Sequence, residues 1–118
     1  MRHNRKRNLL SRPSKVRNAL LRNMATSLVL HDSITTTAAK AKVLKPYVEK
    51  LVTIARTDDL VTAIRKLNAV FYDQEATKKM IEVLKPRYAT RNSGFLSSRK
   101  RLARVSDAAP QIQLLFVS

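Results

Sequence analysis

Residues 38–57 read AAKAKVLKPYVEKLVTIART, and they carry the clearest pattern in the chain. The apolar residues follow one another in steps of three, four, three and four: Ala41, Leu44, Val48, Leu51 and Ala55. Such steps return to one side of a helix at every turn, so the stretch predicts an amphipathic helix with one buried face. Pro46 lies inside the stretch. Because proline lacks a backbone N–H and crowds the preceding turn, we expect a kink or a new helix start there.

A helix is expected before this stretch as well. Pro13 and Ser14 mark its beginning, with Ser14 the better N-cap, and it should end near His31. An apolar stripe at helical spacing follows the cap and consists of Val16, Leu20, Leu21, Met24, Ala25 and Leu28. The stripe predicts the side of this helix that packs on the core.

Two shorter helices are expected after residue 57. The third begins at an aspartate cap, Asp58 or Asp59, and the fourth begins at Asp73. Lys85 and Pro86 should end the fourth helix, because proline cannot continue it. The expected inward side chains are Leu60, Ile64 and Leu67 in the third helix and Ala76, Met80, Ile81 and Leu84 in the fourth.

The remaining apolar stretches favour strands. Residues 34–37 are β-branched and too few for a helix, so they predict a short strand whose last residue, Thr37, caps the next helix. Residues 95–105 and 111–117 predict an antiparallel hairpin around the turn-like residues 106–110. The sequence therefore predicts a two-layer α+β fold, a small mixed or antiparallel sheet with about four helices packed on it.

The 118 residues predict a basic N-terminal arm, residues 1–13, and a single globular domain, residues 14–118. The arm is polar and rich in Asn, Lys and Arg, and it has no apolar period that could bury it. We find no internal repeat and no linker that would divide the rest of the chain.

The charge of the chain predicts a polyanionic partner. Lys and Arg number 24 against 8 Asp and Glu, which gives a net charge of +16. Residues 1–31 and 85–104 contain no acidic residue, whereas both signs mix in residues 32–84. So much like charge on a small domain repels itself unless a partner neutralises it. Two long basic blocks without an acid are typical of a nucleic-acid-binding surface.

Composition excludes several classes of protein. The chain has no Cys and only one glycine, Gly94, which excludes disulfides, thiolate zinc sites and glycine-rich phosphate loops. No apolar run approaches the ~20 residues of a membrane span or the ~7–15 of a secretory signal, so an intracellular, soluble protein is expected. His3 and His31 are not spaced as a metal pair. We therefore expect no catalytic residue, no metal, no cofactor and no small-molecule substrate.

The cations of the two basic blocks are the expected contacts with phosphates. Arg can bind a phosphate through two hydrogen bonds at once, and Asn and His can add further hydrogen bonds. Two lysines also occupy the first turn of the second helix, where the helix dipole does not favour them. The predicted RNA-binding residues are Arg2, His3, Arg5, Lys6, Arg7, Arg12, Lys15, Arg17, Arg22, Asn23, Lys40, Lys42, Arg87, Arg91, Arg99, Lys100 and Arg101.

Each of these groups also has a simpler interpretation. The arm could be a solubilising tail or a localisation signal, and the helix cations could be ordinary surface residues. Arg99, Lys100 and Arg101 are consecutive on a strand and therefore point to both faces. That placement fits RNA contact on an open face, and it also fits an edge strand that charge protects from aggregation. Most aromatic residues are expected in the core, whereas Tyr88, between two arginines, could touch RNA.

Several motifs, taken in order along the chain, resemble a known family. They are residues 22–25 (RNMA), residues 27–28 (SL) with His31, Ile34, residues 35–37 (TTT), residues 40–42 (KAK) with Leu44, Tyr88-Ala89 with Arg91, and Asp107 with Ala109-Pro110. The ordered set is similar to the bacterial large-subunit ribosomal proteins called L-seventeen, over the whole chain. The departures are Asn4, which interrupts the family's Arg-His-Arg-Lys arm, Ser93-Gly94 in place of a glycine pair, and a more basic strand at residues 96–104.

The resemblance implies a structural component of the large ribosomal subunit without catalytic activity. Its implied partners are large-subunit ribosomal RNA, near the mouth of the nascent-peptide tunnel, and neighbouring large-subunit ribosomal proteins. Its implied location is the ribosome, in the cytoplasm or in an organelle. The family's arm and first helix carry RNA contacts, which supports Arg2, His3, Arg5, Lys6, Arg22 and Asn23 as contacts here.

Two other functions fit part of the sequence. A DNA-binding, nucleoid-type protein would need a recognition helix and usually a symmetric dimer, but the basic residues lie at the two ends of the chain. A protein of the membrane surface would account for the basic, amphipathic first helix. It would have no use for the near-neutral middle of the chain or for the hairpin.

Overall fold

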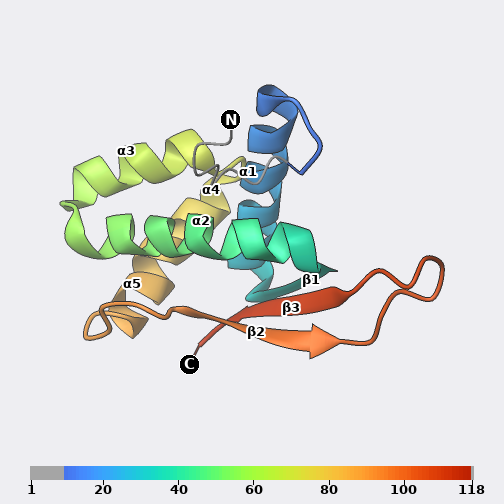
Figure 1. Ribbon diagram of the computed structural model, residues 1–118. Coiled ribbons are helices and arrows are strands. Elements are labelled where there is room, and N and C mark those ends of the chain that lie inside the picture. Colours follow the sequence, from blue (N-terminus) through green and yellow to red (C-terminus); the bar gives the residue numbers. More distant parts are fainter. Residues whose placement is uncertain (1–9, 118) are drawn as a thin grey trace, which may run out of the picture.

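The computed structural model describes residues 10–117 and shows helices packed on one face of a three-stranded sheet (Figure 1). This arrangement confirms the α+β expectation. The elements in chain order are α1 (Ser14–His31), β1 (Ser33–Thr37), α2 (Ala38–Thr57), α3 (Leu60–Val70), α4 (Gln74–Lys79), the π-helical turn η1 (Met80–Leu84), α5 (Lys85–Arg87), β2 (Leu96–Arg101) and β3 (Gln111–Phe116).

Helix α2 is the centre of the helical layer and lies along the sheet (Figure 1). Its predicted apolar face is confirmed, because Ala41, Leu44, Val48, Leu51 and Ala55 are all buried. Of the two expected effects of Pro46, a new helix start is wrong, since α2 is one continuous helix. The proline ring is on the exposed side. The missing hydrogen bond there is offset by the burial of the opposite face.

The predicted boundaries of α1 are close to those observed, but its cap differs. Ser14 is the first helical residue, and Pro13 occupies the N-cap position and accepts a hydrogen bond from the Arg17 backbone N–H at 2.9 Å. The helix ends at His31, after which Asp32 adopts a left-handed conformation with φ of 65°. Asp tolerates this conformation better than most residues, so the chain can turn sharply into β1.

Helix α3 packs through a narrower stripe than its sequence predicts. Asp59 is its N-cap and accepts a hydrogen bond from the Thr62 backbone N–H at 3.4 Å. The side chain of Thr62, and after it this backbone N–H, lowers the pKa of the Asp59 carboxyl. Leu67 and Ala63 are buried, but Leu60 is 53% exposed and Ile64 is 37% exposed. These two predicted core positions are therefore wrong. The reason is that α3 packs mainly on α2 and α4, so one side of its apolar face has no neighbour.

The fourth helix continues past its predicted end. Asp73 caps it, as expected, by accepting a hydrogen bond from the Glu75 backbone N–H at 2.9 Å. Helical backbone then runs through η1 into α5 and ends at Tyr88, so the predicted stop at Lys85 and Pro86 is wrong. The π turn restarts the hydrogen-bonding pattern, and Pro86 falls in the first turn of α5, where its missing N–H costs little.

The sheet has the strand order β1-β3-β2, and both pairs are antiparallel. The predicted hairpin is confirmed, with β2 shorter than residues 95–105. Directly opposed residues project to the same face of a sheet. The register places Ile34 and Ser98 beside Leu114, and Leu96 beside Phe116, on the face that the helices cover. The alternating apolar residues of β3, Ile112, Leu114 and Phe116, therefore face the helices, as the alternation predicts.

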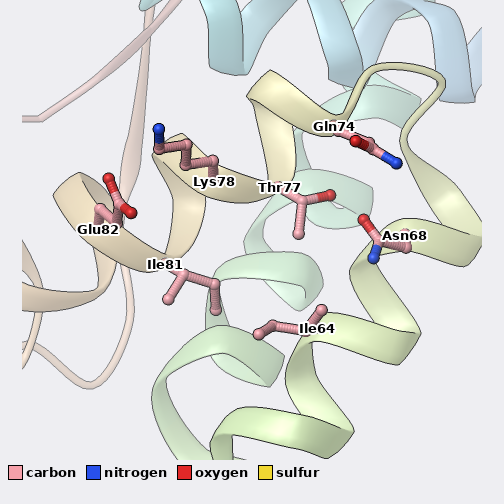
Figure 2. Close-up of a pocket in the computed structure, with 7 residues that line it drawn as sticks. All are labelled: Ile64, Asn68, Gln74, Thr77, Lys78, Ile81 and Glu82. Carbon is pink, nitrogen blue, oxygen red and sulfur yellow. The ribbon is translucent and has the colours of Figure 1, made fainter.

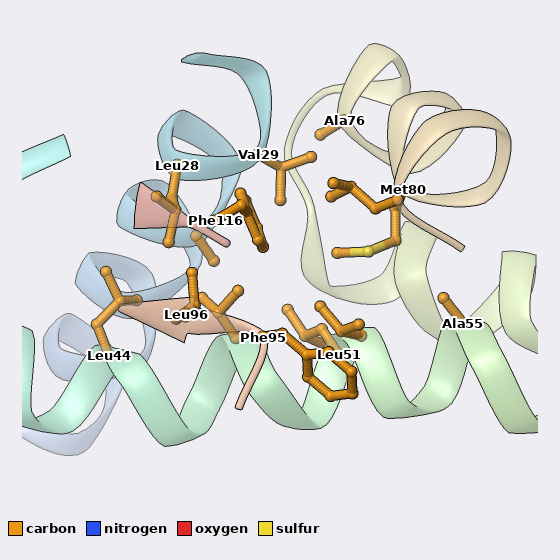
Figure 3. Packing of buried hydrophobic residues seen from close by; sticks show 14 of the residues in the cluster. Leu28, Val29, Leu44, Leu51, Ala55, Ala76, Met80, Phe95, Leu96 and Phe116 are labelled. Atoms are coloured by element: carbon orange, nitrogen blue, oxygen red, sulfur yellow. The ribbon is translucent and has the colours of Figure 1, made fainter. Parts of the chain in front are cut away.

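An aromatic cluster joins the last helix to the sheet. The Tyr88 ring is 5.2 Å from that of Phe95 and 6.4 Å from that of Phe116, between centroids. Figure 3 shows Phe95 and Phe116 among the aliphatic side chains of the core. Tyr88 is 1% exposed and its hydroxyl donates to the Val117 carbonyl, and burial raises its pKa. The expectation that Tyr88 touches RNA is therefore wrong.

Candidate nucleic-acid interface

One face of the sheet is open, and apart from Leu115, which lies between Ser33 and Ser97, its side chains are polar. The register places Thr35 opposite Gln113, which in turn lies opposite Arg99, across all three strands. A second row at the end of the sheet runs from Thr37 through Gln111 to Arg101. Because opposed residues share a face, these hydroxyl, amide and guanidinium groups point away from the helices. We call these six residues the open sheet face.

The cations of β2 are free of acidic partners. Arg99, Lys100 and Arg101 are all exposed, and none of them forms an ion pair within residues 10–117. Lys100 lies opposite Ile112 and so points to the other face, as the sequence predicted for a run of three cations. Arg99 and Arg101 belong to the open sheet face. The two arginines can therefore contact one flat ligand surface together.

Further cations gather at the end of the sheet where β2 finishes. Thr37 ends β1 there, so the first turn of α2 with Lys40 and Lys42 begins at this end. The loop between β2 and β3 projects from the same end, beyond the helices (Figure 1). Lys42 is exposed and Lys40 is half-buried. The fold thus places two pairs of cations, Lys40 with Lys42 and Lys100 with Arg101, at the same end of the sheet, although about 60 residues separate the pairs in the sequence.

Arg87 and Arg91 lie toward the opposite end of the sheet. Both are exposed, and they precede Leu96, the first residue of β2. The Arg91 guanidinium donates to the Gly94 carbonyl at 3.0 Å, across a turn in which Gly94 has φ of +69°. The cations of the second basic block therefore do not form one continuous surface, because Arg87 and Arg91 lie at the start of β2 and Arg101 lies at its end. An extended strand rises about 3.3 Å per residue, so β2 separates its two ends.

The predicted contacts on α1 divide into exposed and internally bonded side chains. Lys15 and Asn23 are exposed and Arg17 is half-buried. Arg12 is also half-buried and donates to the Leu10 carbonyl at 3.0 Å. The remaining predicted contacts, Arg2, His3, Arg5, Lys6 and Arg7, lie outside the residues that the structure describes.

Arg22 has a structural role within the fold. Its Nε donates to the Val70 carbonyl at 2.7 Å, and its guanidinium lies 4.2 Å from the centre of the Tyr72 ring. These contacts tie α1 to the end of α3, 48 residues later. The last carbonyls of a helix need donors, and a half-buried Arg supplies one here. Any contact of Arg22 with RNA would use its two Nη atoms, because Nε is bonded to the Val70 carbonyl.

Acidic residues concentrate on the other side of the molecule. Residues 58–84 contain five acids and four cations, and this segment forms α3, α4 and η1. Ion pairs join Lys66 to Asp58 at 2.7 Å and Lys79 to Asp32 at 2.9 Å. Exposed pairs of this kind contribute little to stability, but they cancel charge locally. The excess of positive charge therefore belongs to the sheet, the hairpin and α1, and not to α3 and α4.

A groove between α3 and α4 is not part of the positive surface. It has a volume of about 370 Å³ and is lined by Ile64, Asn68, Gln74, Thr77, Lys78, Ile81 and Glu82 (Figure 2). One lysine and one glutamate balance its charge. The Thr77 hydroxyl is buried there and has no hydrogen-bond partner in the described part of the chain. An unpaired buried hydroxyl lowers stability.

Replacing Thr77 with Val should therefore stabilise the fold. The change removes the unpaired hydroxyl and keeps the shape, so we expect the free energy of unfolding to rise by about 1 kcal/mol. Thr26→Val is the matched control. The Thr26 hydroxyl donates to the Arg22 carbonyl at 2.8 Å and accepts from the Tyr72 N–H at 3.3 Å, so its loss should destabilise by about 1–3 kcal/mol. Urea unfolding measures both changes, and a destabilised Thr77→Val variant would contradict the assignment.

Several side chains of the surface were not among the predicted contacts. Thr35, Gln111 and Gln113 join the open sheet face, and Arg104 follows β2 in the projecting loop. The two Gln residues alternate with the buried residues of β3, which is the signal that could have placed them on the open face. Among the described residues, no group of His, Asp or Glu is placed to hold a metal ion, and no helix is long and apolar enough to cross a membrane.

Known proteins are similar to this chain over most of its length. The profile of the family Ribosomal protein L17 matches residues 20–117. The chain is 43% identical to "Large ribosomal subunit protein bL17" of Aliarcobacter butzleri, over 99% of this chain and 100% of that protein. The protein of the same name from Sphingopyxis alaskensis is 44% identical over 99% of this chain and 84% of its own length. That from Helicobacter acinonychis is 39% identical, over 99% of this chain and 100% of its own. A profile that spans most of the chain and relatives that match it from end to end show that the chain belongs to the Ribosomal protein L17 family.

Proposed function

We propose that this chain is a structural constituent of the large ribosomal subunit and that it binds ribosomal RNA through the open sheet face and the adjoining hairpin. One observation carries the assignment of the surface. Arg99, Lys100 and Arg101 are exposed, have no acidic partner in the described part of the chain, and adjoin a face of hydroxyl and amide groups. The family supports the ribosomal role, because its members are named large-subunit proteins.

The mechanism is neutralisation of phosphates by side chains at set positions. Lys and Arg release counterions that are condensed on the RNA, and this release drives binding. Thr35, Gln111 and Gln113 supply donors and acceptors that suit the 2′-hydroxyls of the sugar. Exposed Lys15, Asn23, Lys42, Arg87 and Arg91 would widen the contact beyond the sheet. Such a surface recognises the shape of folded RNA and needs no chemical step, so we assign no catalysis to the chain.

The partners and location follow from the same assignment. The relatives are bacterial large-subunit proteins, and bacterial ribosomes lie in the cytoplasm, where we place this chain. Neighbouring ribosomal proteins would contact surfaces that the RNA leaves uncovered. The near-neutral side formed by α3 and α4 is the part of the described chain that fits such a neighbour best. A DNA-binding role has no support in these observations.

Sedimentation of cell lysate through a sucrose gradient tests the proposed function. The chain, carrying a small C-terminal tag, should migrate with the large subunit and stay there after a moderate-salt wash. Electrostatic contacts weaken with salt, so a high-salt wash should release it progressively. Ribonuclease treatment is the control, and it should move the chain to the top of the gradient. Migration as a free species, or with DNA after ribonuclease treatment, would overturn the assignment.

A further inference from the structure

The loop between β2 and β3 holds two apolar side chains entirely in solvent. Leu102 is 92% exposed and Val105 is 102% exposed, the largest values among the apolar residues of the described chain. Figure 1 shows the loop projecting from the sheet, away from every helix. Apolar side chains of this size are usually at least partly covered in a folded domain. Two of them on one projection indicate a surface that a partner covers.

The loop is a formed turn and not a loose connection. Backbone N–H groups of Arg104 and Ala108 donate to the carbonyls of Ala109, at 3.0 Å, and Arg104, at 2.7 Å. The Arg104 guanidinium makes two hydrogen bonds of 3.0 Å with the Asp107 carboxylate. Asp107 also accepts from the Ala109 N–H at 3.2 Å. These bonds hold residues 104–109, which include Val105, and Leu102 directly follows the last residue of β2.

The charges around the two side chains identify the kind of partner. Residues 99–104 carry four cations, and the one acid of the loop, Asp107, is already bonded to Arg104. Arg99, Lys100 and Arg101 are left to attract an anion. A partner protein would need an unusually acidic rim around an apolar pocket to match this tip. RNA offers both features at once, because its phosphates are anionic and the faces of its bases are apolar.

A hollow at the base of the loop has the composition that a nucleotide requires. It measures about 720 Å³ and is lined by Thr35, Lys100, Arg101, Leu102 and Gln111. The two cations suit a phosphate, the hydroxyl and amide groups suit a sugar, and the leucine suits the face of a base. Nucleic-acid-binding proteins use apolar side chains in this way, as wedges against unstacked bases.

We propose that Leu102 and Val105 form an apolar wedge that packs against unstacked bases of the ribosomal RNA, while Lys100 and Arg101 hold the adjoining phosphates. The inference rests on the proposed function, and it adds a contact that does not depend on charge. The dependence of the affinity on salt therefore separates the contribution of the wedge from that of the cations. Removing a cation lowers both the affinity and its dependence on salt, whereas removing the wedge lowers the affinity alone.

The test measures binding of the purified chain to deproteinised large-subunit ribosomal RNA over a series of salt concentrations. The double variant Leu102→Ser, Val105→Ser should bind about 5- to 20-fold more weakly, with an unchanged slope of log affinity against log salt concentration. The matched control is Leu60→Ser, Val61→Ser, which makes the same chemical change at two exposed positions of α3. It should bind like the wild type.

A second readout reports the position of the wedge directly. The chain has no tryptophan, so Leu102→Trp introduces a single reporter. We expect its fluorescence to be quenched on RNA binding, as an indole stacked on a base is, and that of Leu60→Trp to stay unchanged.

The possible outcomes distinguish a failure of the apolar wedge from a failure of the proposed RNA binding. If the wild type does not bind this RNA, both are overturned. If it binds and the double variant binds equally well, only the wedge is overturned. A double variant that binds the RNA normally but is lost from whole subunits would assign the tip to a neighbouring protein, and this too overturns the RNA wedge.

Discussion

Replacing Arg99 and Arg101 together with Gln is expected to weaken binding to large-subunit ribosomal RNA by about 10- to 100-fold near 0.15 M salt. Both side chains lie on the open sheet face, opposite Gln113 and Gln111, and neither has an acidic partner in the described chain. Each phosphate contact that is lost should also reduce the slope of log affinity against log salt by about one. Filter binding or fluorescence anisotropy over a salt series measures both quantities.

A control with the same change in charge shows whether position matters. Arg65→Gln combined with Lys78→Gln removes two exposed cations from α3 and α4, the side where acidic residues concentrate. We expect this variant to bind within about twofold of the wild type, because these charges lie away from the open sheet face and salt screens them over ~8–10 Å. Equal losses in the two variants would mean that net charge, and not the open sheet face, carries the binding.

Replacing Tyr88 with Ala is expected to destabilise the fold by about 3–5 kcal/mol, the range measured when buried aromatic side chains are truncated. The ring is 1% exposed and packs on Phe95 and Phe116, so it joins the last helix to the ends of β2 and β3. The Tyr88 carbonyl also accepts a hydrogen bond from Arg56 Nε at 2.8 Å, which ties this turn to α2. A loss of this size is a large share of the stability of a small domain.

Tyr88→Phe separates packing from the hydroxyl. It keeps the ring but leaves the Val117 carbonyl without its donor, so we expect a smaller loss of about 1 kcal/mol. Urea unfolding followed by circular dichroism gives both values. RNA affinity, measured well below the unfolding midpoint, should stay near that of the wild type for Tyr88→Phe, since Tyr88 is buried. A large drop in affinity without a drop in stability would restore Tyr88 as a contact.

The buried faces of α2 and β3 are predictable from the sequence because their signals are local. The steps of three and four in α2 and the alternation in β3 depend only on how residues of one element are spaced. The end of the fourth helix was harder to predict. Proline at position 86 is a reliable stop signal for an ordinary α-helix, but the π turn before it shifts the hydrogen bonds.

Positions that depend on distant partners were the ones that sequence reasoning missed. Leu60 and Ile64 have the spacing of a core face, yet no element covers that side of α3. Arg22 resembles a phosphate contact, yet it bonds Val70, 48 residues away. Neither outcome can be read from spacing, because each depends on which segments the chain brings alongside.

The sequence alone is sufficient for the α+β architecture, for the two basic blocks at residues 1–31 and 85–104 and for the kind of partner, because periodicity and charge are sums over neighbouring residues. The tertiary structure decides which cations act together. Pairing with β3 places Arg99 and Arg101 on an open face, and the end of β1 places Lys40 and Lys42 at the same end of the sheet as Arg101. Register shifts of one residue would reverse these faces, and register is set by contacts between strands that lie far apart in the chain.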